Sequence, residues 1–544
     1  MDYSKAAGNR PKYNTFDLSH DKRMTMQMGK IIPVMAMDVL PGDKFTIETS
    51  HLTRFLPLVA PVMHNVKVKV RYFFSPNRLV WNNWEDFITG PESVTDTTEP
   101  VHPTVPMTGA PSTIGDYMGI STSVNTPGVA QTVNALPFAH YQYIWNEYFR
   151  DQNLQQELQV GLSDGNNGSN QALYQLRDVA WQHDRFTSAL PFTQKGPEVT
   201  LPILAAEGTG PLGLIPTTYK GYQAGQFNGA TAERSDDGFQ LGGVMAAGSS
   251  RDAIYQNVLN SSSNRFVSLD VTSNTYIDPA DLNASAATIN QLREAFAIQK
   301  WLELNARTGN RYTEHIQAHF GVKPQDSRLQ RPEEFGGSVA TIQFSEVLQT
   351  SETTTSGNDA SALGTMGGHA ITASGSRKAS YYAQEHGWIF ALMYIVPDTT
   401  YFQGVAPKFS KTDRYDYFQP LLAHIGEQPV LNKEVYADGT SADNNVFGYL
   451  PIYDEYRHEL NTVAGQMKDT LSYWHLGRKF ANRPSLNSTF IACDPSNRIF
   501  TQLDNDEQVI AHVYNSVIAQ RKVPYYGTPN DRDWETFHDK IHPR

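Results

Sequence analysis

The sequence predicts a mainly β protein, built as a Greek-key or jelly-roll sandwich with helices and loops inserted between its strands. Strand-like runs occur near both ends of the chain, in residues 31–84 and again after residue 332. The clearest helical patterns lie between these regions, at 288–302 and 312–320. Strands separated by helices and long loops must pair across a great sequence distance, which is typical of such sandwiches.

Residues 1–30 are polar and carry six lysines and arginines against three aspartates, whereas the whole chain has a formal net charge of −12. An extended basic arm and a solvated, poorly ordered terminus are both consistent with this composition. If the segment is an arm, Lys5, Arg10 and Lys12 are candidates for contact with DNA.

Residues 66–72 show the strongest strand pattern, because valines and Tyr72 alternate with Lys67, Lys69 and Arg71. We call these three residues the cation row. Successive side chains of a strand point to opposite faces, so we expect the valines and Tyr72 in the core and the cation row on the other face. That face could be a surface turned to solvent or to a neighbour, or it could contact DNA, with nearby aromatic rings stacked on unpaired bases.

A compositional break at residues 205–290 predicts a surface insertion. The segment is dominated by small polar residues and has four cations and eight carboxylates. Its scattered aromatic residues favour an ordered loop over a disordered linker. Before it, Tyr141, Trp145, Tyr148 and Phe149 have the spacing of one amphipathic helix.

The composition favours a protein whose surface is partly covered by neighbours. Charged residues make up 18% and aromatic residues 11% of the chain, and interface cores are poor in charge and rich in aromatic rings. The only cysteine is Cys493, so no intramolecular disulfide is expected. This cysteine content is consistent with assembly in a reducing cytoplasm. The N-terminal segment lacks the apolar core of a signal peptide, and no apolar run has the length of a membrane span.

The chemical motifs do not predict an enzyme or a cofactor. GTGPLG at 208–213 matches a dinucleotide-binding pattern, but prolines follow it where a helix should begin. His315 and His319 have the spacing of zinc ligands, but Ile316 occupies the position of the general-base glutamate, so two helix-surface histidines are the better interpretation. Cys493 follows an apolar run, as a small core residue does.

Several blocks of sequence, in one order along the chain, resemble the major capsid proteins of gokushoviruses, which are small Microviridae phages with circular single-stranded DNA. The blocks include SHDKRMTMQMGKIIPV, PGDKFTIETSHLTRFLPLVAPVMHNVKVKVRYFFSP, DRFTSALPFTQKGP, LREAFAIQKWLELNARTGNRYTEHIQAHFGV, RLQRPEEFGGS, EHGWIFALMYIVPDTTY, HIGEQPVLNKEVYA, VFGYLPIYDEYRHELN, WHLGRKF and VPYYGTPN. The resemblance is weakest at 205–290 and in the last fourteen residues.

The resemblance implies an eight-stranded antiparallel jelly roll with large inter-strand insertions, sixty copies of which form a T=1 shell. It implies an N-terminal arm at 1–30, a core at 31–204 and 291–544, and a protrusion at the threefold axis formed by 205–290. The protrusion would contact a host receptor, for which a surface glycan is one candidate. Candidate contact residues are Tyr222, Asn228, Phe239, Tyr255 and Asn260.

The resemblance also implies partners: a small basic DNA-packaging protein, minor pilot or spike-type virion proteins and the single-stranded genome. A net charge of −12 agrees with a separate basic protein, because binding to a polyanion scales with the cations brought to its phosphates. The expected location is the virion, after assembly in the cytoplasm of the host bacterium. Alternatives on the same scaffold are a carbohydrate-binding protein that forms no shell and a glycoside hydrolase.

Overall fold

The computed structural model describes residues 13–90, 99–120, 129–197, 199, 290–308, 311–348, 366–502 and 507–524, and the backbone of residues 219–223, 255–257, 265–269 and 289. The chain divides into two compact units, one formed by Met1–Lys195 with Glu303–Arg544 and the other by Gly196–Leu302. In the second unit three short strands pair in the order β8-β10-β9. The two larger sheets and the cation row belong to the first unit.

The strands of the described residues have the following bounds: β1 Asn14–Asp17, β2 His20–Met26, β3 Ile32–Val39, β4 Lys44–Phe55, β5 Val66–Pro76, β6 Thr104–Met107, β7 Gln131–Asn134, β8 Tyr219–Gln223, β9 Tyr255–Asn257, β10 Arg265–Leu269, β11 Glu333–Thr341, β12 Gln343–Leu348, β13 Met366–Gly375, β14 Ala379–Tyr382, β15 Gly387–Pro397, β16 Glu427–Leu431, β17 Val446–Pro451 and β18 Val509–Arg521. The α-helices are α1 Trp84–Thr89, α2 Ile114–Tyr117, α3 Leu136–Tyr148, α4 Ile289–Thr308, α5 Tyr312–Phe320, α6 Asn432–Val435 and α7 Ser488–Ile491. No helix of the described residues is long and apolar enough to cross a membrane.

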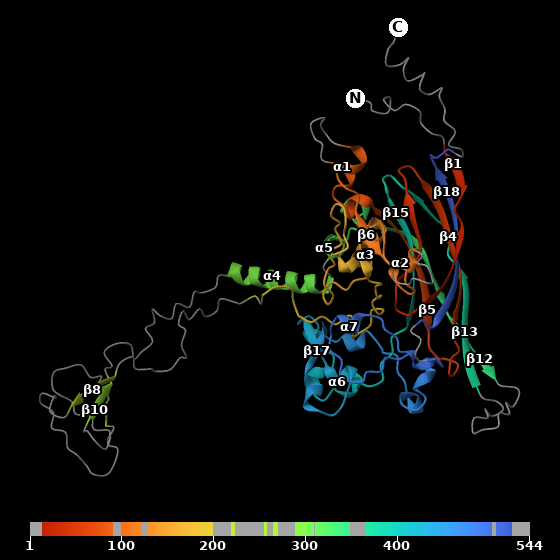
Figure 1. The fold of residues 1–544 in the computed structure, drawn as a ribbon. Helices are drawn as coiled ribbons and strands as arrows, with labels where there is room; N and C mark the ends of the chain where they lie inside the picture. The colour runs from red at the N-terminus through yellow and green to blue at the C-terminus, as the bar shows by residue number, and fades with distance from the viewer. Residues whose placement is uncertain are drawn as a thin grey trace, which may run out of the picture. The chain divides into compact units, whose positions relative to one another are not determined.

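Two antiparallel sheets face each other and form a β-sandwich (Figure 1). The large sheet has the order β1-β18-β4-β13-β12, with β2 also paired to β18 and β14 to β4. The small sheet has the order β11-β5-β15-β3. Every pairing in both sheets is antiparallel, and β18, close to the end of the described chain, pairs with β4 from Val509 opposite Phe55 to Gln520 opposite Lys44. The expected pairing across a great sequence distance is therefore confirmed.

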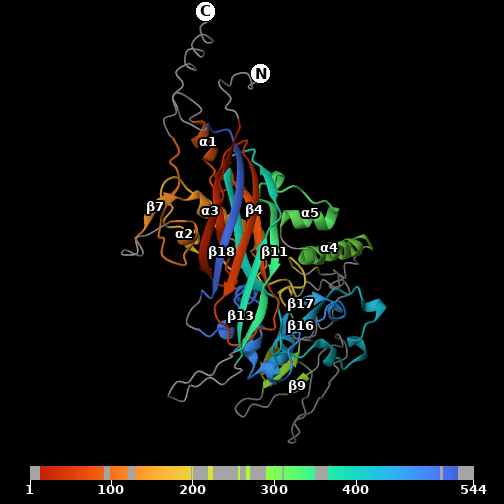
Figure 2. The ribbon, with the colours of Figure 1, turned by 90° about the vertical axis from the view of Figure 1, so that its right-hand side faces the viewer.

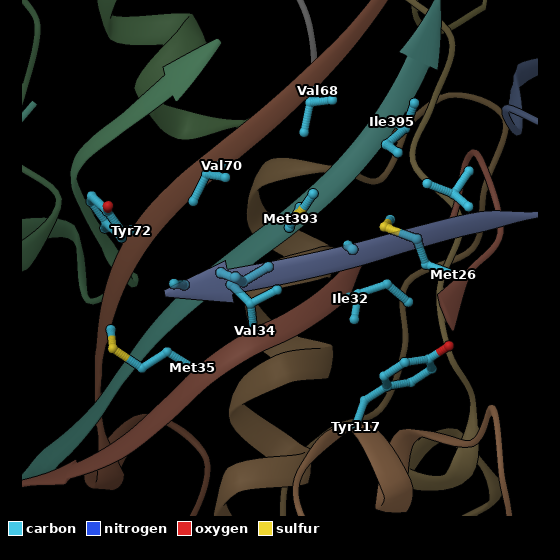
Figure 3. Close-up of a cluster of buried hydrophobic side chains, with 14 of the residues drawn as sticks. Met26, Ile32, Val34, Met35, Val68, Val70, Tyr72, Tyr117, Met393 and Ile395 are labelled. Atoms are coloured by element: carbon cyan, nitrogen blue, oxygen red, sulfur yellow. The ribbon is translucent and has the colours of Figure 1, made fainter. Parts of the chain in front are cut away.

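The core lies between the two sheets. The valines at 66, 68 and 70 and Tyr72 are at most 1% exposed, which confirms that this face of β5 points inward. Val34 of β3 and Met393 of β15 reach the same cluster, with Met26 of β2 from the large sheet (Figure 3). Burying a large apolar side chain contributes about 1.5–3 kcal/mol, so this cluster is a principal source of the stability of the sandwich.

A second apolar cluster covers the other face of the small sheet. Phe73 of β5 and Phe390 of β15 point into it, where they meet Phe138 and Tyr141 of α3. Helix α3 lies on the side of the small sheet away from the large sheet (Figures 1 and 2). The expected helix is confirmed, and because most of α3 is buried it is covered on more sides than the amphipathic pattern of its aromatic residues predicts.

Strand β18 was not predicted as a strand, although it is central to the large sheet. Its side chains alternate strictly between buried and exposed positions over most of its length, with Val509, Ala511 and Val513 buried and Ile510 exposed. That alternation is visible in VIAHVYNSVIAQR and is typical of a strand with one covered face. The alternation is hard to recognise in the sequence because some residues on the exposed face are also apolar.

The N-terminal boundary is corrected by strands β1 and β2. An arm was expected at residues 1–30, but β1 and β2 are part of the large sheet, with Asn14 opposite Arg521 and Met26 opposite Val509. In His20–Met26 half-buried residues alternate with exposed ones until the buried Met26, so the segment is an edge strand rather than a solvated terminus. Residues 1–12 lie outside the described part of the chain.

Candidate nucleic-acid interface

The cation row lies on β5 and points away from the core between the sheets. β5 pairs with β15 on one side and β11 on the other, so its backbone position is defined from both edges. All three side chains of the row are half-buried. The row therefore lies neither on an open wet surface nor in a closed core, because residues 148–151 and 179–183 of the same unit partly cover it.

Lys67 is paired within the chain. Its ammonium group lies 2.7 Å from Asp398 Oδ1, just after β15. Asn65 Nδ2 donates to the other oxygen of the same carboxylate at 2.5 Å. The charge of Lys67 is therefore already balanced, and binding of a phosphate by Lys67 would compete with Asp398.

Arg71 is paired even more extensively. Its Nε donates to Glu334 Oε1 of β11 at 2.6 Å, and a second bond joins the same two side chains. The guanidinium lies 5.2 Å from the ring centroid of Phe73 and 5.3 Å from that of Phe149. Burial works against the charged form, but the hydrogen bond and charge of Glu334 outweigh it, and the pKa of Arg71 is raised.

Lys69 differs from its two neighbours. It forms no hydrogen bond or ion pair within the described residues. Burial lowers the pKa of Lys69, and the charges of Lys67 and Arg71 lower it further. An anion bound next to Lys69 would therefore stabilise the charged form of its side chain.

Two hollows meet at Lys69 and Arg71. The smaller, about 230 Å³, also has Arg150, which follows α3, and Arg311, which precedes α5, in its lining; we call it the basic hollow. The larger, about 700 Å³, extends along β11 and has Arg377 in its lining. The structure thus adds three arginines, distant in sequence, to the predicted row.

Three of the four phenylalanine, tyrosine and tryptophan side chains that line the basic hollow are not available for base stacking; the fourth, Tyr148, is half-buried. Phe149 is 6%, Trp181 4% and Tyr394 5% exposed, although all three line the basic hollow. Their rings pack behind the cations as part of the second apolar cluster. The expectation that nearby aromatic rings stack on bases is therefore wrong for these three residues.

The other basic residues expected to face DNA are Lys5, Arg10 and Lys12, which lie outside the described residues. Three further cations of residues 1–30 are described and are occupied, among them Arg23, which lies 2.6 Å from Asp21. Lys22 donates to the carbonyl oxygen of Pro33 at 2.7 Å, and burial lowers its pKa to about 8. Lys30 lies 2.6 Å from Asp178.

The candidate host-contact residues belong to the second unit. Asn228, Phe239 and Asn260 lie outside the described residues. Tyr222 and Tyr255 lie on β8 and β9, which flank β10, with Tyr222 opposite Phe266 and Tyr255 opposite Ser268. Their role in host contact stays a prediction.

The zinc-like histidine pair lies on α5, with ring centroids 4.2 Å apart and His319 Nε2 2.8 Å from Asn305 Oδ1. The described residues contain no group of three or more metal-ligating side chains. Cys493 is buried in the second core, and burial raises the pKa of its thiol well above the ordinary value. Its prediction as a core residue is confirmed.

Comparison with known proteins gives one family. Residues 4–530 match the family model described as capsid protein (F protein). The chain is 33% identical to capsid protein VP1 of Chlamydia phage 1, over 95% of this chain and 96% of the relative. It is 35% identical to VP1 of Bdellovibrio phage phiMH2K, over 88% and 87%, and 32% identical to VP1 of Spiroplasma virus 4, over 98% and 97%. The chain belongs to this capsid protein family.

Membership of the capsid protein family confirms the resemblance found in the sequence blocks, since all three relatives come from gokushoviruses. The family consists of structural proteins and not of enzymes. The interpretation as a glycoside hydrolase is thereby excluded.

Within this capsid protein fold, Arg150, Arg311 and Arg377 are the basic residues that the sequence did not indicate. They come from three segments, and only folding brings them to the cation row. Arg150 follows the aromatic run of α3, so its position beside the end of a helix could be expected from the sequence. Its proximity to β5 could not.

Proposed function

We propose that this chain is a major capsid protein, sixty copies of which assemble into a T=1 icosahedral shell around a circular single-stranded DNA genome. The observation that carries the proposal is the similarity, over at least 87% of each relative, to three phage proteins named capsid protein VP1. The protein would be located in the virion after assembly in the cytoplasm of the host bacterium.

The proposal includes an eight-stranded jelly roll as the shell-forming module. If β1 with β2 and β13 with β14 each count as one position, the sheets read β2-β18-β4-β13 and β3-β15-β5-β11. In chain order, strands then alternate between sheets except at the step from β5 to β11. That alternation is the wrapping pattern of a jelly roll, with β12 as an additional edge strand.

Exposed apolar side chains in residues 405–425 support self-assembly. Leu421 is 94% and Phe409 75% exposed, and Tyr415, Tyr417, Phe418 and Ile425 are more than half exposed. Monomeric proteins rarely expose so many large apolar groups in one short segment, whereas subunit interfaces are rich in aromatic residues. We infer that a neighbouring subunit covers this segment.

Replacing both Phe409 and Leu421 by serine is expected to abolish particle assembly and to leave the subunit folded. The two side chains make few contacts in their own chain, so the loss falls on the subunit contact. Sedimentation velocity measures the particles, and circular dichroism measures the fold. Leu421→Met, which keeps the apolar area, should assemble normally. Normal particles from the double serine variant would remove this segment from the interface.

The insertion at 205–290 is proposed to protrude at the threefold axes and to contact a host receptor, with a surface glycan as one candidate. Replacing residues 225–253, between β8 and β9, by a short glycine-serine linker should leave particles that assemble but adsorb poorly to host cells. Particle yield and adsorption are measured on the same preparation. Loss of assembly would show that the segment is not peripheral.

The chain's net charge of −12 supports a division of labour in packaging. We propose that a small basic packaging protein neutralises most of the genome and that minor pilot or spike-type proteins complete the virion. Direct contacts of this chain with DNA would then be few and local. Lys69 and residues 5–12 are the candidates, because Lys67 and Arg71 of the cation row are already paired with Asp398 and Glu334.

A further inference from the structure

Buried polar atoms without partners gather around the basic hollow. Eleven buried side-chain nitrogen and oxygen atoms of the described residues lack a hydrogen-bond partner. Six of these atoms belong to residues that line the basic hollow and two adjoining hollows of about 400 and 450 Å³: Arg150 Nε, Gln152 Oε1, Gln182 Nε2, Thr308 Oγ1, Arg311 Nε and Arg331 Nε. Most of them are donors, so the site favours an acceptor-rich ligand.

The charge of the basic hollow also favours an acceptor-rich, anionic ligand. Lys69, Arg71, Arg150 and Arg311 line it, and Asp151 is the only carboxylate in its lining. Arg71 and Arg311 are paired with Glu334 and Glu314, but neither Lys69 nor Arg150 forms an ion pair within the described residues.

Burial lowers the pKa of both Lys69 and Arg150. The charges of Glu157, Glu147 and Asp151 offset part of this effect at Arg150, but none of them forms an ion pair with it. Two half-buried cations that form no ion pair among the described residues are costly unless an anion joins them. This excess of positive charge stands out in a chain with a net charge of −12.

We propose that the basic hollow binds a backbone phosphate of single-stranded DNA, with Lys69 and Arg150 as its principal cations. The inference deepens the proposed function, because it rests on a shell that encloses such a genome. Three of its lining rings, those of Phe149, Trp181 and Tyr394, are buried, and the half-buried Tyr148 donates its hydroxyl to Asp326 and the carbonyl oxygen of Pro332, so the hollow recognises the phosphate and not the base. Binding is therefore independent of sequence. The opening of the hollow accordingly faces the interior of the particle.

A phosphodiester suits the hollow better than a protein carboxylate. Its tetrahedral oxygens can accept hydrogen bonds from several directions, whereas a carboxylate accepts them in one plane. Lys69 and Arg150 come from different segments, one on β5 and one after α3. A flexible single strand can also bend to place one phosphate in a hollow of about 230 Å³.

The test measures binding of fluorescein-labelled decathymidylate to full-length, unassembled chain by fluorescence anisotropy over a salt series. Lys69→Ala is expected to weaken binding about three- to tenfold and to reduce the slope of log K against log salt by about 0.7, the value for one single-strand phosphate contact. Lys69→Gln should behave alike, and circular dichroism checks that both variants fold. The matched control is Lys67→Ala, in the same strand and on the same face, which should change affinity by less than about twofold because Asp398 already occupies Lys67.

Competition experiments distinguish a DNA phosphate from free phosphate and from a protein carboxylate. Inorganic phosphate at millimolar concentration should displace the oligonucleotide from wild type, and decathymidylate should bind far more tightly than phosphate. Equal affinities, or tighter binding of hexaglutamate than of decathymidylate, would overturn the proposal. So would unchanged binding by Lys69→Ala. Particle formation, followed separately by sedimentation, tests the shell, so failure of the shell and failure of the phosphate site are distinguishable.

Discussion

Replacing Arg185 by methionine is expected to destabilise the subunit by about 3–5 kcal/mol. The Arg185 side chain is 3% exposed and lies 2.9 Å from both Glu434 Oε2 and Asp454 Oδ2, whose side chains are 8% and 6% exposed. Without the guanidinium, the two buried carboxylates lose the cation that they share, which costs more than the ion pairs contribute. Urea unfolding of unassembled subunits, followed by tryptophan fluorescence, measures the loss.

The control for Arg185 is Lys408→Met. Lys408 lies 2.6 Å from Glu459, but both side chains are more than half exposed, so the change should stay within about 0.5 kcal/mol. Adding Glu434→Gln and Asp454→Asn to Arg185→Met should recover part of the stability, because the buried charges are then gone. A loss from Arg185→Met no larger than that from Lys408→Met would contradict this account of the buried cluster.

Acidification from pH 6.5 to pH 4.5 is expected to destabilise the subunit, with His140 alone contributing about 2–3 kcal/mol. His140 is fully buried between Ser75 Oγ at 2.8 Å and Asn77 Oδ1 at 3.0 Å, and burial lowers its pKa to about 3. Below pH 6.5 His140 binds a proton in the unfolded chain but stays neutral in the folded chain. The free energy of unfolding therefore falls as the pH falls toward 3. Burial lowers the pKa of His51, His64 and His475 in the same direction.

The variant His140→Gln isolates this contribution. It should be less stable than wild type at pH 7 but should lose less stability between pH 6.5 and 4.5, as measured by urea midpoints at each pH. Parallel slopes for wild type and His140→Gln would show that buried carboxylates, not His140, set the acid response.

The strand patterns show how far sequence reasoning reached. β5 and β15 were predicted because VKVKV alternates and WIFALMYIV is continuously apolar, and the structure shows why these patterns differ. β15 is covered on both faces, by the large sheet and by α3, whereas the first half of β5 is covered fully on one face only. β18 alternates as clearly as β5, but its exposed face carries Ile510, Tyr514 and Ile518, which made the pattern look irregular.

The candidate site was predicted only in part. Lys67, Lys69 and Arg71 look equivalent in the sequence, because they share one strand face. Their difference depends on Asp398 and Glu334, which lie more than 250 positions away in the chain. No spacing rule relates such residues, so the isolation of Lys69 could not be foreseen.

The sequence by itself determined the family, the β character, the inward face of β5 and the compositional break at 205–290, since these depend on local order and composition. The tertiary structure decided which cations are already neutralised and which side chains surround Lys69. Ion pairing and burial depend on distances between segments that only folding brings together. Local periodicity records which face of a strand is covered, but it carries no information about what covers that face.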